Sequence, residues 1–136
     1  MRHVLIDSSA FLSLEDPDER AHTATRAAFR ELVSARAHLV TTNFVFDETY
    51  TLILTRLGRH RAVAWGRDAR ASRLIELVRV GEDHEQAAWE LIVSFDDKAF
   101  SYTDATSFAV ARSLEIREAL SLDGHFREYG RLQVLP

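Results

Sequence analysis

The segment Val4-Leu5-Ile6-Asp7-Ser8-Ser9-Ala10 decides the fold, because a short apolar run ends there in a carboxylate and a helical pattern follows. We expect a buried strand over residues 2–6. A buried parallel strand that ends in Asp places its carboxylate at the carboxyl end of the strand, where α/β proteins collect their ligands. The function therefore depends on which later acids reach the same edge.

The overall composition is that of a globular protein with one core. The chain has 136 residues and no cysteine, which excludes a disulfide framework, a thiolate metal site and a cysteine nucleophile. The net charge of −4 argues against a protein that coats nucleic acid by charge alone. No apolar run has the length of a signal peptide or a membrane span, so we expect a cytoplasmic protein without a membrane partner, forming a single domain over residues 1–136.

Strand and helix signals alternate along the chain. Asp16 before Pro17, and Asp83 with Gln86 three residues later, indicate helix starts. The helix that begins at Asn43 carries apolar residues in nearly every direction, so we expect most of its circumference to be buried. This alternation predicts a three-layer α/β/α sandwich around a central, mostly parallel sheet. The expected strands cover 2–6, 38–41, 75–80, 119–122 and 132–135, and the expected helices 9–14, 16–35, 43–57, 59–73, 83–94 and 103–113.

Four acids occupy special positions in this pattern. Asp7 and Asp123 end predicted strands, Asp104 opens a predicted helix, and Glu48 interrupts an apolar helix. Strand ends and the starts of the following helices share one edge of a parallel sheet, so we expect the three aspartates to converge there, with Glu48 within reach. Four carboxylates repel one another unless a cation neutralises them or their pKa values rise. Oxygen ligands without cysteine or regular histidine spacing favour Mg²⁺ or Mn²⁺ over zinc.

Each acid also has a purely structural explanation. Asp7 and Asp104 suit the N-cap position of a helix, and Asp123 before Gly124 suits a turn. Glu48 could pair with one of the arginines between Arg56 and Arg73, which serve either to guide an anionic substrate or as a solvated helix face. The common location of all four acids nevertheless favours a metal site.

Each of the four acids lies in a longer segment with a recognisable sequence. The segments are Leu5-Ile6-Asp7-Ser8-Ser9-Ala10-Phe11, Asn43-Phe44-Val45-Phe46-Asp47-Glu48-Thr49, Ser101-Tyr102-Thr103-Asp104-Ala105-Thr106-Ser107-Phe108 and Ala119-Leu120-Ser121-Leu122-Asp123-Gly124-His125-Phe126. In their order and spacing they resemble the PIN domain, and the compact length resembles the VapC toxins of toxin–antitoxin pairs. The resemblance covers essentially the whole chain. It places the acidic quartet of the family on Asp7, Glu48, Asp104 and Asp123, and its hydroxyls near the site on Ser8 and Thr103.

The resemblance implies a metal-dependent endoribonuclease that hydrolyses RNA phosphodiester bonds as the toxin of a type II toxin–antitoxin system. It implies Mg²⁺ (Mn²⁺ possible) at the quartet, with Asp7 and Asp104 as the first candidate ligands, Asp123 next, and Glu48 as a ligand or water-orienting group. The implied partners are an RNA substrate, a small cognate antitoxin whose tail occupies the acidic cleft, and a second copy in a homodimer.

Other interpretations remain open at this point. The scaffold could serve as a non-catalytic RNA- or partner-binding module. A phosphotransfer protein is disfavoured, because Ser9 stands where a haloacid-type phosphatase needs a second Asp. Asp97 is better explained as a solvated loop acid than as an aid to a second metal ion, and His125 as a turn histidine packed beside Phe126.

Overall fold

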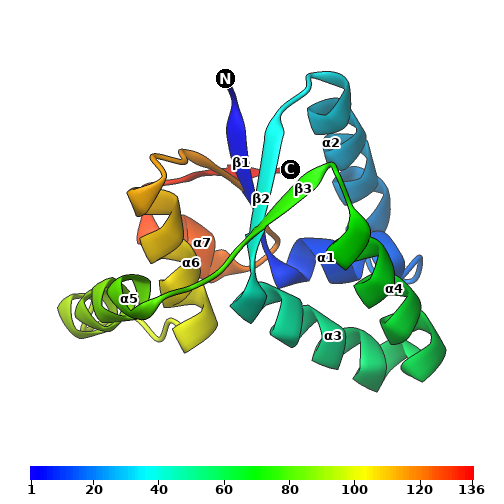
Figure 1. Cartoon of the computed structure of the whole chain (residues 1–136). Coiled ribbons are helices and arrows are strands. Elements are labelled where there is room, and N and C mark those ends of the chain that lie inside the picture. Colours follow the sequence, from blue (N-terminus) through cyan, green and yellow to red (C-terminus); the bar gives the residue numbers. More distant parts are fainter.

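The computed structural model describes residues 1–136, which form five strands and seven helices (Figure 1). The elements in chain order are β1 (His3–Ile6), α1 (Ser8–Glu15), α2 (His22–Ser34), β2 (His38–Thr42), α3 (Asn43–Leu57), α4 (Arg59–Ala71), β3 (Ile75–Val78), α5 (Glu82–Ser94), α6 (Tyr102–Ser113), β4 (Glu118–Leu120), α7 (Gly124–Tyr129) and β5 (Gln133–Leu135).

The five strands form one sheet in the order β3-β2-β1-β4-β5, and every neighbouring pair is parallel. β1 is the central strand. The chain first builds outward from it to β2 and β3, and then returns to the opposite side of β1 with β4 and β5. The strand order therefore reverses between β1 and β4, and an open α/β sheet collects ligands outside the carboxyl ends of its strands at such a point.

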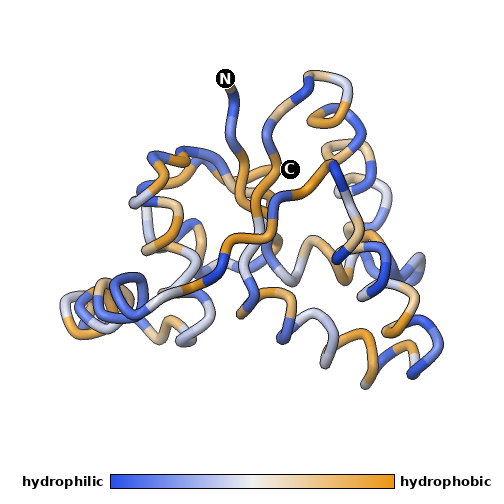
Figure 2. The backbone as a smooth tube through the Cα atoms, in the orientation of Figure 1, coloured by the Kyte–Doolittle hydropathy of each residue, from blue (hydrophilic) through white to orange (hydrophobic).

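Helices cover both faces of the sheet, which confirms the expected three-layer α/β/α sandwich. In Figure 1, α1 to α4 lie to one side of the strands and α5 to α7 to the other. Successive residues of β1 alternate between the two faces. Val4 and Ile6 join the apolar core under α1 to α4, whereas Leu5 joins the core under α5 to α7. Figure 2 shows apolar residues along the central strands and alternating polar and apolar residues along the helices.

The limits of α3 agree with the sequence signals. Thr42 is its N-cap, and the Thr42 hydroxyl accepts a hydrogen bond from the Val45 N–H at 3.0 Å. Gly58 ends the helix at a φ of 93°, a backbone conformation that favours glycine. Because α3 follows β2 without a loop, its first turns lie at the carboxyl edge of the sheet.

Three sequence-based predictions about helices are wrong. Asp16 starts no helix, because its carboxylate accepts a local hydrogen bond from the Asp18 N–H at 2.9 Å, and α2 begins only at His22. Asp83 is not an N-cap, since α5 begins at Glu82 after Gly81.

The third wrong prediction concerns burial of α3. Only Val45, Thr49 and Ile53 are fully buried on this helix, and Leu54 is 39% exposed. α3 runs along the lower margin of the molecule in Figure 1, so one side faces α1 and α4 and the other faces solvent.

No helix in the structure combines the length and the apolar character that crossing a membrane requires.

Candidate metal centre

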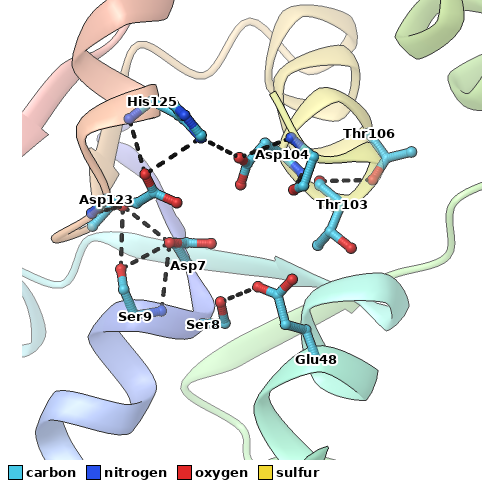
Figure 3. Close-up of polar contacts among 11 residues, drawn as sticks. Asp7, Ser8, Ser9, Glu48, Thr103, Asp104, Thr106, Asp123 and His125 are labelled. Carbon is cyan, nitrogen blue, oxygen red and sulfur yellow. Dashed lines mark hydrogen bonds and ion pairs between the residues drawn. The ribbon is translucent and has the colours of Figure 1, made fainter. Parts of the chain in front are cut away.

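The candidate site lies at the reversal of strand order. Asp7 directly follows β1, Asp123 lies just beyond β4, and Glu48 belongs to the helix that follows β2. Asp104 arrives from the opposite layer, in the first turn of α6. The fold therefore brings together four segments that are distant in the sequence, and Figure 3 shows their side chains around one space.

Asp7 is held firmly by one carboxylate oxygen only. Its Oδ2 accepts hydrogen bonds from the Ser9 hydroxyl at 2.8 Å, the Ser121 hydroxyl at 3.0 Å and the Ser9 N–H at 3.4 Å. The residue is only 2% exposed, and its other oxygen, Oδ1, is buried without a hydrogen-bond partner. Asp7 is thus the N-cap of α1 and also directs an unpaired oxygen toward the space between Asp104 and Glu48 (Figure 3).

Asp104 is the third residue of α6, the helix that it was expected to open. Ser101 is the N-cap of α6, and its hydroxyl accepts from the Asp104 N–H at 3.0 Å. In return, the Asp104 Oδ2 accepts from the Ser101 N–H at 3.3 Å, which completes a capping box. The same Oδ2 lies 3.1 Å from Nδ1 of His125.

Asp123 caps the short helix α7 and stands beside the same histidine. Its Oδ1 accepts from the His125 N–H at 2.9 Å and lies 3.6 Å from the His125 Nδ1. The carboxylate of Asp123 is 37% exposed, so it forms the open side of the cluster, whereas Asp7 and Asp104 form its buried floor.

Glu48 faces the cluster from the first half of α3. Its Oε1 accepts a hydrogen bond from the Ser8 hydroxyl, which ties α3 to the start of α1. The adjacent Asp47 is exposed. Thr103 accepts a hydrogen bond at its carbonyl from the Thr106 hydroxyl at 2.8 Å, and Figure 3 places its side chain between Asp104 and Glu48.

Burial raises the proton affinity of the two enclosed aspartates, Asp7 and Asp104. Burial raises the pKa of Asp7 from 3.8 to about 6, and the charge of Asp104 adds to the rise, while hydrogen bonds from Ser9 and Ser121 oppose it. Burial and the charge of Asp123 likewise raise the pKa of Asp104. Burial lowers the pKa of His125, but its hydrogen bond to Asp104 and the charges of both aspartates outweigh that effect and raise it.

The donor set fits a hard divalent cation. One ligand atom each from Asp104, Asp123 and His125 lie within 4.8 Å of one another. The buried and unpaired Oδ1 of Asp7 is costly unless a proton or a cation satisfies it. Carboxylate oxygens are the ligands that Mg²⁺ and Mn²⁺ prefer in proteins.

Other residues considered in the sequence lie outside this cluster. Asp97 is 74% exposed and pairs with Lys98 at 3.4 Å, as expected for a loop acid. Trp65 is a core residue, buried against Phe11 and Phe46. Trp89 is 56% exposed on α5.

The arginine-rich segment is remote from the acids. Arg56 pairs with Glu19 at 3.1 Å and Arg61 with Glu15 at 3.6 Å, so these two side chains help to hold α3 and α4 against the segment around α1. Arg56 lies about 12 Å further along the α3 axis than Glu48, at about 1.5 Å of rise per residue. Glu48 forms no ion pair with any of these arginines and is bonded instead to the Ser8 hydroxyl, so the alternative in which it pairs with one of them is wrong.

Sequence reasoning missed three residues that contact the acids. Ser9 and Ser121 hold Asp7, although Ser8 was the expected supporting hydroxyl. His125 was expected to pack beside Phe126, but the recorded contacts of its ring are with Asp104, Asp123 and Phe100. Only Ser9 carried a signal in the sequence, because it follows the strand-end acid Asp7 by two residues, a spacing that suits local side-chain hydrogen bonding.

Acidic side chains that converge at the strand-order reversal of a parallel α/β sandwich are typical of metal-dependent hydrolases acting on phosphate esters. Comparison with known families identifies the chain more closely: residues 4–132 match the PIN domain. The chain belongs to the PIN domain family, which confirms the prediction from the four sequence segments.

Two further comparisons agree with this assignment. The chain is 34% identical over 133 residues to the 23S rRNA-specific endonuclease VapC20 of Mycobacterium tuberculosis, and the match covers 98% of both chains. The crystal structure of the M. tuberculosis VapC20, described as a Sarcin-Ricin loop cleaving toxin, matches with a TM-score of 0.86 and 33% identity over 98% of this chain and 99% of that one. VapBC2 of Rickettsia felis, solved with a promoter DNA fragment, shares the fold at 9% identity with a TM-score of 0.74, over 97% and 96% of the two chains.

Proposed function

We propose that residues 1–136 form one nuclease unit, a metal-dependent endoribonuclease that acts as the toxin of a type II toxin–antitoxin pair. The observation that carries this proposal is the unpaired, buried Oδ1 of Asp7 among three further carboxylates at the reversal of strand order. The similarity to a 23S rRNA-specific endonuclease over nearly the full length supports RNA as the substrate.

Asp7, Asp104 and Asp123 are the proposed ligands of Mg²⁺, with Mn²⁺ as a substitute, and Glu48 is a fourth ligand or orients a water molecule. Such an ion supplies a water of lowered pKa and a positive charge beside the attacked phosphate. The protein holds Asp7 through Ser9 and Ser121, and Glu48 through Ser8. Thr103 is proposed as a further support, because its side chain lies between Asp104 and Glu48 (Figure 3).

The hydrolysis needs an electron-poor phosphorus and an attacking water in line with the leaving oxygen. The buried aspartates form a floor that water cannot enter freely, so their charges act at close range. Asp123 and Glu48, which are partly exposed, flank that floor and are the proposed contacts with the attacking water.

The decisive experiment compares RNA cleavage by the wild type, Asp7→Asn and Asp104→Asn in Mg²⁺ or Mn²⁺. Both variants are expected to lose cleavage by at least about 100-fold while keeping the wild-type circular dichroism spectrum. Asp97→Asn is the matched control, because Asp97 is an exposed acid in the loop before α6. Full cleavage by either site variant would remove the acids from the mechanism.

A non-catalytic RNA- or partner-binding module on the same scaffold is the competing function. It predicts RNA binding that is indifferent to divalent cations, and no cleavage under any metal. Titration of the wild type with Mn²⁺ separates the two functions, since the proposed nuclease must bind the ion whereas the binding module need not.

We further propose a cytoplasmic protein, since its RNA substrate is there, with two protein partners. A small antitoxin is proposed to insert its tail into the acidic cleft, where the negative charge suits a basic side chain. A homodimer is proposed through α5, because Trp89 and Val93 lie one turn apart and are 56% and 60% exposed. Light scattering of the wild type and of Trp89→Asp tests the dimer, which the substitution is expected to break.

A further inference from the structure

The two buried aspartates are held in the same manner. In each, one oxygen accepts hydrogen bonds from the protein: Oδ2 of Asp7 from Ser9 and Ser121, and Oδ2 of Asp104 from the Ser101 N–H and the His125 ring. Hydrogen bonds on one oxygen fix the plane of a carboxylate and leave its other oxygen available to a ligand.

We propose that His125 is a positioning residue that fixes the carboxylate of Asp104 for divalent metal binding, as Ser9 and Ser121 do for Asp7. This inference rests on the proposed function, because it concerns the same metal centre. The only other hydrogen bond to the Asp104 carboxylate is the longer one from the Ser101 N–H, at 3.3 Å against 3.1 Å for the histidine. Without His125, the carboxylate therefore keeps a single and weaker restraint.

The direction of the hydrogen bond follows from the chemistry of the partners. An ionised carboxylate only accepts, so Nδ1 of His125 must carry the hydrogen that it donates to Asp104. The neutral ring then keeps its free lone pair on Nε2. Metal ligation through Nδ1 would require the loss of this hydrogen and of the bond to Asp104.

Both the backbone and the ring of His125 are held in place. Its backbone N–H donates to Asp123 Oδ1 at 2.9 Å, which fixes the start of α7. The ring meets that of Phe100 edge-on, with centroids 5.7 Å apart and an interplanar angle of 75°. Phe100 in turn packs against the fully buried Phe108, so the orientation of the imidazole is anchored to the core of this layer.

Two amide substitutions distinguish the loss of the hydrogen-bond donor that faces Asp104 from the loss of side-chain volume. In His125→Asn the amide nitrogen is attached to Cγ, as Nδ1 is, so the variant retains a donor at the position that faces Asp104. In His125→Gln the amide nitrogen is one atom further out, in the manner of Nε2. His125→Ala removes both donors, and His60→Ala is the control, because His60 is an exposed histidine on α4.

The experiment is a Mn²⁺ titration of each purified full-length variant by electron paramagnetic resonance, with cleavage kinetics in parallel. We expect His125→Ala and His125→Gln to bind Mn²⁺ about 10- to 100-fold more weakly, the usual loss when a group that orients a ligand is removed. We expect His125→Asn to remain within about threefold of the wild type, by the same reasoning. The weakened variants should regain cleavage when Mn²⁺ is raised, with little change in the KM for RNA.

Each contrary result shows whether the positioning role alone or the proposed nuclease function as well is wrong. Wild-type affinity in His125→Ala, or equal losses in the Asn and Gln variants, overturns the positioning role while the nuclease function stands. A directly bonded nitrogen in pulsed spectra of the wild-type Mn²⁺ complex also overturns it, because it would make His125 a ligand. A wild type that neither binds Mn²⁺ nor cleaves RNA overturns both the positioning role and the proposed function.

Discussion

Replacement of Asp7 by Asn should change how the stability of the metal-free protein depends on pH. Burial raises the pKa of this carboxyl to about 6 in the folded chain, from its ordinary value of 3.8. Below about pH 3 the carboxyl is mainly protonated in both states and does not change the free energy of unfolding. As the pH rises, the unfolded chain ionises first, and the folded state loses stability until the pH exceeds its own pKa.

The size of this effect follows from the two pKa values. Their difference corresponds to about 3 kcal/mol, at about 1.36 kcal/mol per pKa unit. In the variant, an amide group without a hydrogen-bond partner lies buried at the position of the unpaired Oδ1. This lowers the stability of the variant by about 1–3 kcal/mol, but the loss does not depend on pH. The stability of Asp7→Asn relative to the wild type should therefore improve by about 2.5 kcal/mol between pH 4 and pH 7.5, because the unfolded carboxyl is already partly ionised at pH 4.

Urea unfolding in EDTA at several pH values between 4 and 7.5 measures this difference directly. Asp47→Asn is the control, because Asp47 is exposed beside Glu48, and its difference from the wild type should stay flat. A flat difference for Asp7→Asn as well would refute the reasoning, since it would mean that folding imposes no electrostatic penalty on Asp7. A saturating divalent cation should stabilise the wild type against unfolding and leave Asp7→Asn unchanged, so that the wild type becomes the more stable of the two proteins.

Three further predictions concern the site and the fold. Glu48→Gln should lower RNA cleavage at least about 10-fold, whereas Asp47→Asn should not; equal activities would show that the carboxylate bonded to Ser8 takes no part. Phe108→Ala should lower the free energy of unfolding by about 3–5 kcal/mol, as measured in urea, because this ring is fully buried and stacks on Tyr129 at 4.1 Å. Gly58→Ala should cost about 1–3 kcal/mol in the same assay, because the φ of 93° strains any residue with a Cβ; an unchanged midpoint would contradict that.

The sandwich and the sheet were predictable because their signals are repetitive. Each strand is a short apolar run, and each reappears in the structure within two residues of its expected limits. The start of α3 at Asn43 was also predictable, because Thr42 places a hydroxyl directly before the helix, where N-capping is its dominant role. Asp16 misled the prediction because a carboxylate before Pro satisfies a local turn as readily as it caps a helix.

The acids were easier to predict than the groups that hold them. Asp7 and Asp123 follow predicted strands, and the carboxyl ends of parallel strands lie at the same edge of a sheet, so the sequence alone brings these two acids together. The hydroxyl of Ser121 reaches Asp7 across 114 residues of chain, and the ring of His125 reaches Asp104 between two helices. Such contacts depend on how elements pack, and a residue spacing alone does not reveal them.

Placement of the site between β1 and β4 also governs when a newly made chain becomes active. β1 pairs with β4 across more than a hundred residues, as in Val4 with Glu118. Contacts of such separation form late in folding, because closing the long loop costs entropy before the pairing compensates. A chain still on the ribosome therefore holds Asp7 and Glu48 without Asp123, so the enzyme that we propose completes its metal centre only after its fourth strand has been synthesised.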